Sequence, residues 1–183
     1  TPDDAGAVLL IEFQRLPKLL QTLDPEAARE LVRLVADRFT SSVRTVDRLV
    51  RSKPHADNAV AARVAVHDFA VLAPGIGSPA DAARFAQHLN AALNQPFEWR
   101  GHKLSLAAHC GVALAPRDGR DADAVIRHAR MALGAAHSAP ARLKVFTQSL
   151  DREASARLML EREMRGALDR NEFRAYFQPK LNL

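Results

Sequence analysis

Hydrophobic residues near the start of the chain follow two different spacings. Residues 7–11 form a short run of mostly branched apolar side chains after two aspartates and a glycine, a pattern typical of a buried strand. From Asp24 and Pro25 onward the apolar residues take a helical spacing, and these two residues suit the N-cap and the first helical position. The positions expected to face the core are Ala28, Leu31, Val35, Phe39, Val43, Val46 and Val50. The sequence therefore predicts a core strand followed by a long amphipathic helix.

The remainder of the chain alternates between strand-like and helix-like stretches. Residues 59–66 and 69–73 predict a hairpin with a tight turn at His67 and Asp68. The further predicted elements are a helix over 79–94, a hairpin of strands over 97–100 and 103–114, a helix over 121–137, a strand over 143–146, a charged helix over 149–170 and a strand over 172–178. This order predicts an α+β fold, with a central mixed, mostly antiparallel sheet flanked by helices and related to the ferredoxin-like arrangement.

Length and composition agree with a globular domain. The chain has 183 residues, of which 48% are hydrophobic and 26% charged, so it can bury a core and global disorder is excluded. The longest apolar runs are too short for a membrane span or a secretory signal. The single cysteine, Cys110, excludes an internal disulfide and is expected to be a small buried hydrophobic residue. We therefore expect a cytoplasmic segment, and Thr1 in place of an initiator methionine suggests a longer parent chain that could be tethered to a membrane.

The charge of the chain permits an anionic partner without requiring one. Lys and Arg outnumber Asp and Glu by 26 to 21, which gives a formal net charge of +5. The arginines are interspersed with acidic residues, and aromatic residues make up only 5% of the chain, so no basic stripe with stacking side chains is present. We expect no nucleic-acid partner and no membrane contact by this segment.

Four segments carry a resemblance to known families. Residues 69–75 (FAVLAPG), 110–119 (CGVALAPRDG) and the alanine-rich stretch 122–136 resemble the GGDEF domain of bacterial cyclic-di-GMP signalling proteins. Residues 160–180 look like the opening helix and first strand of an EAL phosphodiesterase domain. The resemblance implies a tandem GGDEF-EAL parent, with a degenerate GGDEF domain over 1–147, a connecting helix over 148–170 and the first strand of a truncated EAL domain over 171–183. In that strand, Gln178 matches a position that contacts the dinucleotide in EAL domains.

The signature turn departs from the pattern of the GGDEF family. The resemblance implies that an active member is a diguanylate cyclase, which holds two GTP molecules in a head-to-head dimer with divalent metal on carboxylates of the first strand and of this turn. Here the turn reads Ala65, Val66, His67, Asp68 and Phe69. Ala65 and Val66 add Cβ atoms where the family has glycines, and His67 replaces the metal-binding acid. Only Asp68 keeps a carboxylate, while Glu12 occupies the position of the strand acid as a vestigial metal position.

Further positions that resemblance assigns to GTP are also changed. Leu20 and Arg29 align with the two residues that read guanine, and His137 aligns with the lysine that contacts phosphate. Leucine cannot supply the hydrogen bonds that a base requires. We therefore predict no catalytic residue, no metal site, and loss of both magnesium and GTP binding. His109 and His128 are interpreted as single histidines, either at the surface or satisfied in the core.

Arg44 and Asp47 have the Arg-x-x-Asp form of the inhibitory product site of this family. Arginine can clamp a phosphate or a guanine edge with two hydrogen bonds. The pair lies too far before the signature turn, however, and an i,i+3 salt bridge on a helix explains it equally well. It remains a weak candidate for cyclic-di-GMP binding.

Three functions remain open from the sequence. The first is a catalytically inactive regulatory domain, serving as scaffold, homodimer element or allosteric input to the adjoining EAL domain. The second is a module that docks a protein partner through residues 52–58, an insertion relative to the family. The third is a residual diguanylate cyclase in which Glu12 and Asp68 hold metal.

Overall fold

The computed structural model describes residues 5–50, 59–65 and 67–170, together with Glu172, Arg174 and Tyr176. The chain divides after Thr147 into two compact units. The second unit contains the helix α5 (Gln148–Asp169). The assignment of these parts to a degenerate GGDEF domain, a connector and an EAL strand stays a prediction.

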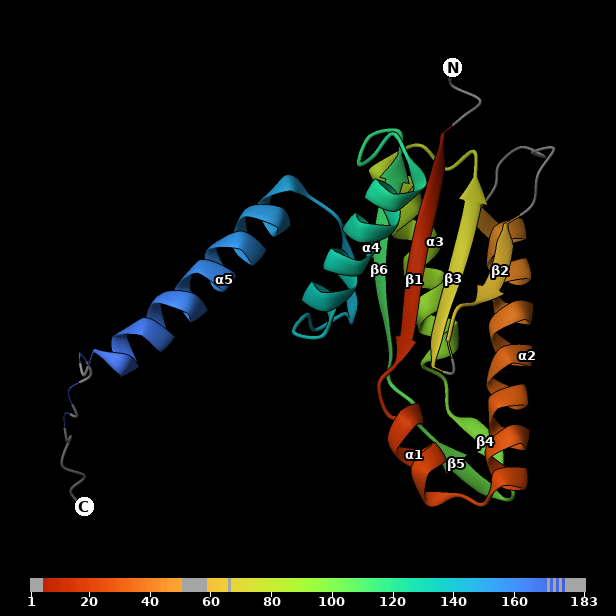
Figure 1. Cartoon of the computed structure of the whole chain (residues 1–183). Coiled ribbons are helices and arrows are strands. Elements are labelled where there is room, and N and C mark those ends of the chain that lie inside the picture. Colours follow the sequence, from red (N-terminus) through yellow and green to blue (C-terminus); the bar gives the residue numbers. More distant parts are fainter. Residues whose placement is uncertain are drawn as a thin grey trace, which may run out of the picture. The chain divides into compact units, whose positions relative to one another are not determined.

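The first unit is built on a five-stranded sheet (Figure 1). Its strands lie in the order β2 (Val60–Arg63), β3 (Asp68–Pro74), β1 (Gly6–Phe13), β6 (Ala108–Ala115) and β7 (Leu143–Val145). All neighbours are antiparallel except β6 and β7, which are parallel. The predicted mixed, mostly antiparallel sheet is confirmed.

Helices cover the two faces of this sheet unequally. The long helix α2 (Pro25–Val50) and α3 (Pro79–Leu93) lie on one face, and α4 (Ala122–Ala136) lies on the other (Figure 1). The short helix α1 (Leu16–Thr22) follows β1. Every helix in the described segments is too short or too polar to cross a membrane.

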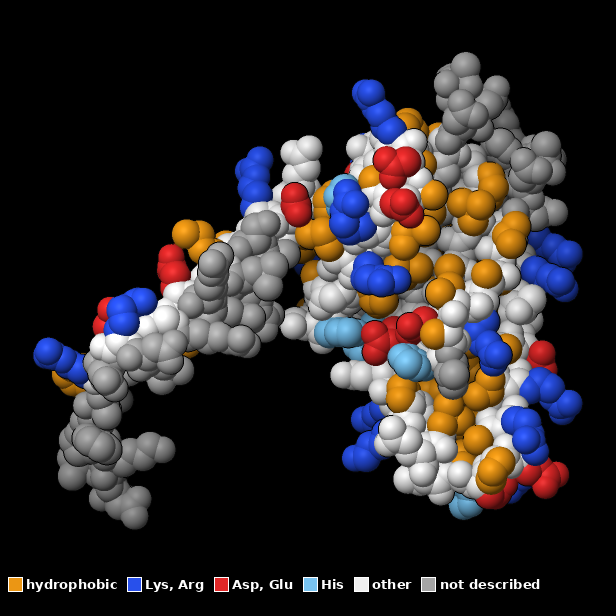
Figure 2. Space-filling model, viewed as in Figure 1, with side chains coloured by type: hydrophobic (Ala, Val, Ile, Leu, Met, Phe, Trp, Pro, Cys, Tyr) orange, Lys and Arg blue, Asp and Glu red, His pale blue; other side chains and the backbone are white. Residues whose placement is uncertain are grey.

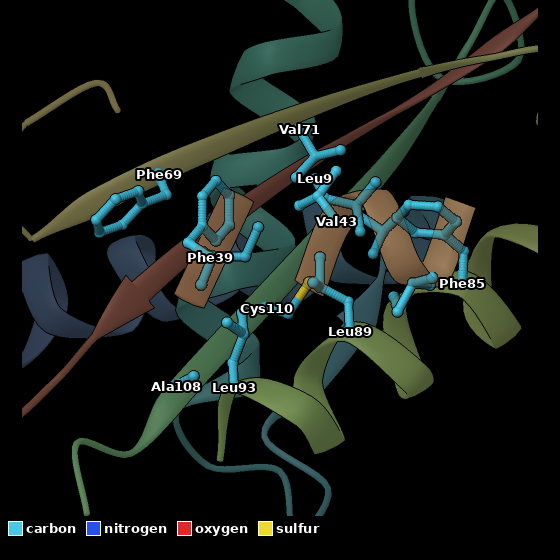
Figure 3. Packing of buried hydrophobic residues seen from close by; sticks show 14 of the residues in the cluster. Leu9, Phe39, Val43, Phe69, Val71, Phe85, Leu89, Leu93, Ala108 and Cys110 are labelled. Carbon is cyan, nitrogen blue, oxygen red and sulfur yellow. The ribbon is translucent and has the colours of Figure 1, made fainter. Parts of the chain in front are cut away.

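The main core lies between the sheet and the pair α2 and α3 (Figure 3). Alternate residues of β1, from Ala7 to Phe13, are buried on this face, as the period of a strand requires. Phe69 of β3 packs against Phe13 and Phe39, with ring centroids 5.5 Å and 4.7 Å away. The phenylalanine of the signature turn is therefore a core residue that anchors β3.

Asp24 caps the start of α2, as the sequence predicts. The Asp24 carboxylate accepts hydrogen bonds from the N–H groups of Ala27 and Glu26, each at 2.9 Å, and the first of these is the main reason that the pKa of Asp24 is lowered. The buried face begins at Ala27, so the prediction that Ala28 starts it was wrong by one residue. Ala28 is half-buried at the edge of that face.

The prediction of a single strand over 103–114 was also wrong. β5 (His102–Leu104) pairs with β4 (Phe97–Trp99) in a separate two-stranded sheet, and β6 starts only at Ala108. Between them, Ala107 has a positive φ of 54°, which ends the extended conformation. The carbonyls of Ala107 and Leu106 accept hydrogen bonds from Gln14 and Arg15, each at 3.2 Å, so the break ties this segment to the end of β1.

Close packing of α4 on β6 fixes the position of the end of that helix. A methyl group at Gly111 of β6 would overlap the backbone nitrogen of Leu133 and the backbone oxygen of Ala129. The helix backbone therefore rests directly on the strand at this glycine. His137, at the C-cap of α4, is thereby held above the end of β1.

Candidate functional site

The signature turn closes the β2–β3 hairpin beside the end of β1. The N–H groups of Val64 and Ala65 donate to the carbonyl of Asp68, at 2.9 and 3.1 Å. The N–H of Phe13 donates to the carbonyl of His67 at 3.2 Å, which joins the turn to β1. His67 Nε2 lies 3.5 Å from Asp68 Oδ1, and Val66 lies outside the described residues.

Strand register brings Glu12, the position that the resemblance assigns to metal, next to this turn. Glu12 pairs across the strands with Asp68 of β3 on one side and with His109 of β6 on the other. All three residues are on the face of the sheet that α4 covers in part, because side chains alternate along each strand. The structure therefore places Glu12 beside Asp68, while the described ion-pair contact of His67 is with Asp68.

His137 makes the closest described contact of the Glu12 side chain. His137 Nε2 lies 3.3 Å from Glu12 Oε2, and both side chains are only partly exposed, at 37% and 26%. The ring of His137 also meets the ring of His109 edge to face, with centroids 4.9 Å apart. An acid and two histidines thus gather where the end of β1 meets the end of α4.

His109 is the residue of this group that the sequence interpretation missed. It is 3% exposed, and its Nδ1 atom has no hydrogen-bond partner within the described part of the chain. Burial lowers the pKa of His109, and the neighbouring His137 and Arg142 lower it further. A neutral imidazole therefore fills the space beside Glu12. Only the register of β1 with β6, which links residues far apart in sequence, would have signalled this role.

The donor set at this point does not fit a magnesium ion. Within residues 5–50, 59–65 and 67–170, no three His, Cys, Asp or Glu side chains are arranged to hold one metal. Glu12 and Asp68 are neighbours, but each has a histidine nitrogen within 3.5 Å. Magnesium requires oxygen ligands in near-octahedral order, and neutral imidazole is a poor substitute.

The two positions that the resemblance assigns to guanine, Leu20 and Arg29, line an apolar hollow with a basic rim. This hollow of about 590 Å³ lies between α1, α2 and β2. Its other lining residues are Ala28, Val32, Arg33, Ala36 and Arg63. None of these side chains is an amide or a carboxylate, so the described lining offers no acceptor for the N–H groups of a guanine edge.

Arg44 and Asp47 lie on α2, away from the signature turn. Asp47 is 5% exposed, and its Oδ2 accepts a hydrogen bond from the N–H of Ala59 at 3.2 Å. Ala59 precedes β2, whereas the turn follows it, so the pair and the turn lie at opposite ends of that strand. Asp47 therefore helps to position the start of the β2–β3 hairpin.

The remaining predicted positions have different outcomes. Cys110 is fully buried, so the expected small buried residue is confirmed, and burial raises the pKa of its thiol to about 12. His128 stacks on Phe146, with ring centroids 4.1 Å apart, and contacts the carbonyl of Asp118. Gln178 and residues 52–58 lie outside the described residues, so their roles stay predictions.

The fold and the turn define an α+β domain of the nucleotide-cyclase-like kind, with a hairpin turn facing an acid at the end of the first strand. The family model described as "Diguanylate cyclase, GGDEF domain" matches residues 2–142. The chain therefore belongs to the GGDEF family.

Individual relatives agree with this assignment. The chain is 26% identical over 181 residues to "Cyclic di-GMP phosphodiesterase NbdA" of Pseudomonas aeruginosa, covering 97% of this chain and 21% of that protein. It is 29% identical over 154 residues to "Bifunctional diguanylate cyclase/cyclic di-GMP phosphodiesterase MucR" of the same organism, covering 80% of this chain and 20% of that protein. The chain thus spans about a fifth of the length of these curated relatives.

A solved structure titled as an EAL/GGDEF domain protein from M.capsulatus has the same fold. It matches with a TM-score of 0.64 and 22% identity, and the match covers 79% of this chain and 86% of that chain. At this identity the likeness supports the fold alone, which is the α+β arrangement described above.

Proposed function

We propose that this chain is a catalytically inactive GGDEF domain that serves as scaffold or allosteric input to an adjoining EAL domain in cyclic-di-GMP signalling. The observation that carries the proposal is the contact between Glu12 and His137 at 3.3 Å. By resemblance, these two positions would bind metal and phosphate in an active relative. In this chain they satisfy one another.

Binding of magnesium and GTP would have to overcome several costs at once. Glu12 would have to break its contact with His137. The metal would also lack the second carboxylate that the family supplies, because His67 stands at that position. A base at Leu20 would lose hydrogen bonds to water without gaining replacements, at about 1–3 kcal/mol for each unpaired group. Phosphoryl transfer depends on positioning and charge neutralisation, so a site that lacks both cannot accelerate it.

The relatives support an EAL domain as the partner. NbdA is named a cyclic di-GMP phosphodiesterase and MucR a bifunctional enzyme, and this chain corresponds to about a fifth of each. The solved relative from M.capsulatus is titled an EAL/GGDEF domain protein. The likeness of residues 160–180 to the start of an EAL domain points in the same direction.

The helix α5 is a suitable element for connecting the two domains. Met159, Leu160 and Met164 are large apolar residues on its exposed surface, among many charged neighbours. Such a helix can pair with its copy in a homodimer or transmit a rotation to the next domain. Either use keeps the regulatory role and requires no nucleotide.

Two assays test this proposal. Incubation of the chain with radiolabelled GTP and Mg²⁺ is expected to give no cyclic-di-GMP, while an active GGDEF domain run in parallel does. In the parent protein, deletion of residues 1–147 is expected to change the rate or the signal response of the EAL domain. Product formation by the isolated chain, or an EAL domain indifferent to the deletion, would contradict the proposal.

A further inference from the structure

The hollow between α1, α2 and β2 joins an apolar floor to a basic rim. Its volume of about 590 Å³ is that of a small-molecule site. The floor is formed by Leu20, Ala28, Val32 and Ala36, which are all half-buried. Figure 2 shows Lys and Arg side chains beside hydrophobic ones in the area where α1 and the first half of α2 lie in Figure 1. Apolar and positively charged groups therefore border the same space.

The floor follows a single row of side chains along α2. Ala28, Val32 and Ala36 are spaced by four residues, so they lie one above another on one face of the helix. This stretch of helix rises by about 12 Å, which sets the length of the row. The two alanines leave room on either side of Val32. A ligand that fits the row is narrow and apolar, and an extended chain of about ten carbons has this length at about 1.2 Å per bond.

Three arginines form the rim of the hollow. Arg29 and Arg33 lie one turn apart on α2, where like charges repel each other. Arg63, the last residue of β2, is on the same face of that strand as Ala61, which packs against the core beneath α2. The side chain of Arg63 is therefore on the α2 side of the sheet, where it lines the hollow with the other two. Three positive charges thus border one apolar surface.

The rim arginines are not neutralised by the part of the chain that the structure describes. No described carboxylate forms an ion pair with Arg29, Arg33 or Arg63. Glu30, which follows Arg29 on α2, is paired with Arg100 at 2.7 Å. An anion at the rim would neutralise the local positive charge, and arginine binds phosphate and carboxylate groups with two parallel hydrogen bonds. Charge complementarity therefore favours a ligand with an anionic head group.

We propose that this hollow binds an amphiphilic anion. Its alkyl chain, of about ten carbons, lies along Ala28, Val32 and Ala36, and its phosphate or carboxylate head lies at the three rim arginines. An alkyl chain needs no hydrogen-bond partner from the floor, whereas a guanine edge does. Burial of the methylene groups and neutralisation of the rim both favour binding. The domain would therefore bind a lipid-like anion at the place that the resemblance assigns to a nucleotide base.

The test is a calorimetric titration of the full 183-residue chain with decyl phosphate below the concentration at which it forms micelles. We expect a Kd of about 0.1 mM at low salt, and weaker binding when salt screens the rim charges. Decanoate, titrated in parallel, shows whether a carboxylate head serves as well as a phosphate head. Inorganic phosphate lacks the chain and decyltrimethylammonium has the opposite charge, so both should bind about tenfold more weakly or less.

Variants of the chain locate the binding site. Val32→Glu places a carboxylate in the floor and should weaken decyl phosphate binding by about tenfold or more, whereas Leu49→Glu, at an exposed leucine of the same helix, leaves it unchanged. The double variant Arg33→Gln and Arg63→Gln changes only exposed side chains and should weaken binding to a similar extent. Arg127→Gln, at an exposed position of α4 outside the hollow, is its matched control. Circular dichroism verifies that each variant is folded.

Two results would overturn the proposal. The first is binding of decyl phosphate that is absent or no tighter than that of inorganic phosphate. The second is binding that both the floor variant and the rim variant leave unchanged, since it would place the ligand elsewhere on the chain. The inference goes beyond the proposed regulatory role and does not depend on it. The titration contains neither GTP nor an EAL domain, so its failure would leave the proposed loss of catalysis untouched.

Discussion

Glu12 at the end of β1 and His137 at the end of α4 are in contact through Oε2 and Nε2, at 3.3 Å. Two elements hold this pair in place. The backbone of α4 rests on Gly111, and β6 is in register with β1 so that His109 lies beside Glu12. The contact is therefore a consequence of the fold as a whole, and we propose that it keeps metal from binding at Glu12.

The packing of α4 on Gly111 predicts opposite effects for two glycine substitutions. Gly111→Ala should lower the free energy of unfolding by about 3 kcal/mol or more, because the added methyl group overlaps the helix backbone, which cannot move aside as a flexible side chain would. Gly134→Ala, on α4 itself, meets nothing within 4 Å and should raise it by about 0.5–1 kcal/mol through helix propensity. Urea denaturation of both variants makes the comparison. Equal effects would show that α4 does not rest on this strand.

Stability should depend on pH through His109. Burial lowers its pKa in the folded chain, whereas in the unfolded chain the value is about 6.5. As the pH falls through 6.5 the unfolded state takes up a proton that the folded state does not, so the free energy of unfolding falls by up to about 1.4 kcal/mol per pH unit. The loss ends when the pH reaches the folded pKa.

The variant His109→Leu isolates this contribution. The substitution removes the titrating group and places an apolar side chain next to His137. The free energy of unfolding of the variant should therefore fall less than that of the wild type between pH 7 and pH 5. Denaturation curves at several pH values give the difference. Parallel pH profiles for the two proteins would mean that His109 is not held neutral.

Alanine substitutions of Arg44 and Asp47 should differ in their effect on the free energy of unfolding. Asp47→Ala leaves the N–H of Ala59 without its acceptor and should lower the free energy of unfolding by about 1–3 kcal/mol. Arg44→Ala, at an exposed position, should change it by less than about 0.5 kcal/mol. Thermal denaturation measures both values.

The same two variants test the inhibitory-site alternative. Since the Asp47 carboxylate is used within the fold, calorimetric titration with cyclic-di-GMP should give the same result for Arg44→Ala as for the wild type. Tight binding to the wild type that Arg44→Ala abolishes would restore the alternative.

Local signals in the sequence were sufficient for most elements of the fold. The run from Ala7 to Ile11 is part of the central strand β1, and the predicted cap Asp24 accepts a backbone hydrogen bond at the start of α2. These features depend on residues close together in the chain, so a single sequence contains them. The break at Ala107 was missed because alanine carries no signal for a positive φ, which the contacts with Gln14 and Arg15 impose.

The site was less predictable than the fold. The changed residues of the signature turn can be recognised in the sequence, but the gathering of Glu12, His109 and His137 depends on strand register and on the packing of α4. This is a relationship between distant segments, which the periodicity of one segment cannot reveal.

The most direct test of the central claim is isothermal titration of the chain with GTP in the presence of Mg²⁺. We predict no binding heat at nucleotide concentrations up to about 1 mM, which corresponds to a binding free energy weaker than about −4 kcal/mol. Micromolar binding that requires Mg²⁺ and disappears in Glu12→Ala would contradict the account, because it would show that Glu12 leaves His137 to hold the metal.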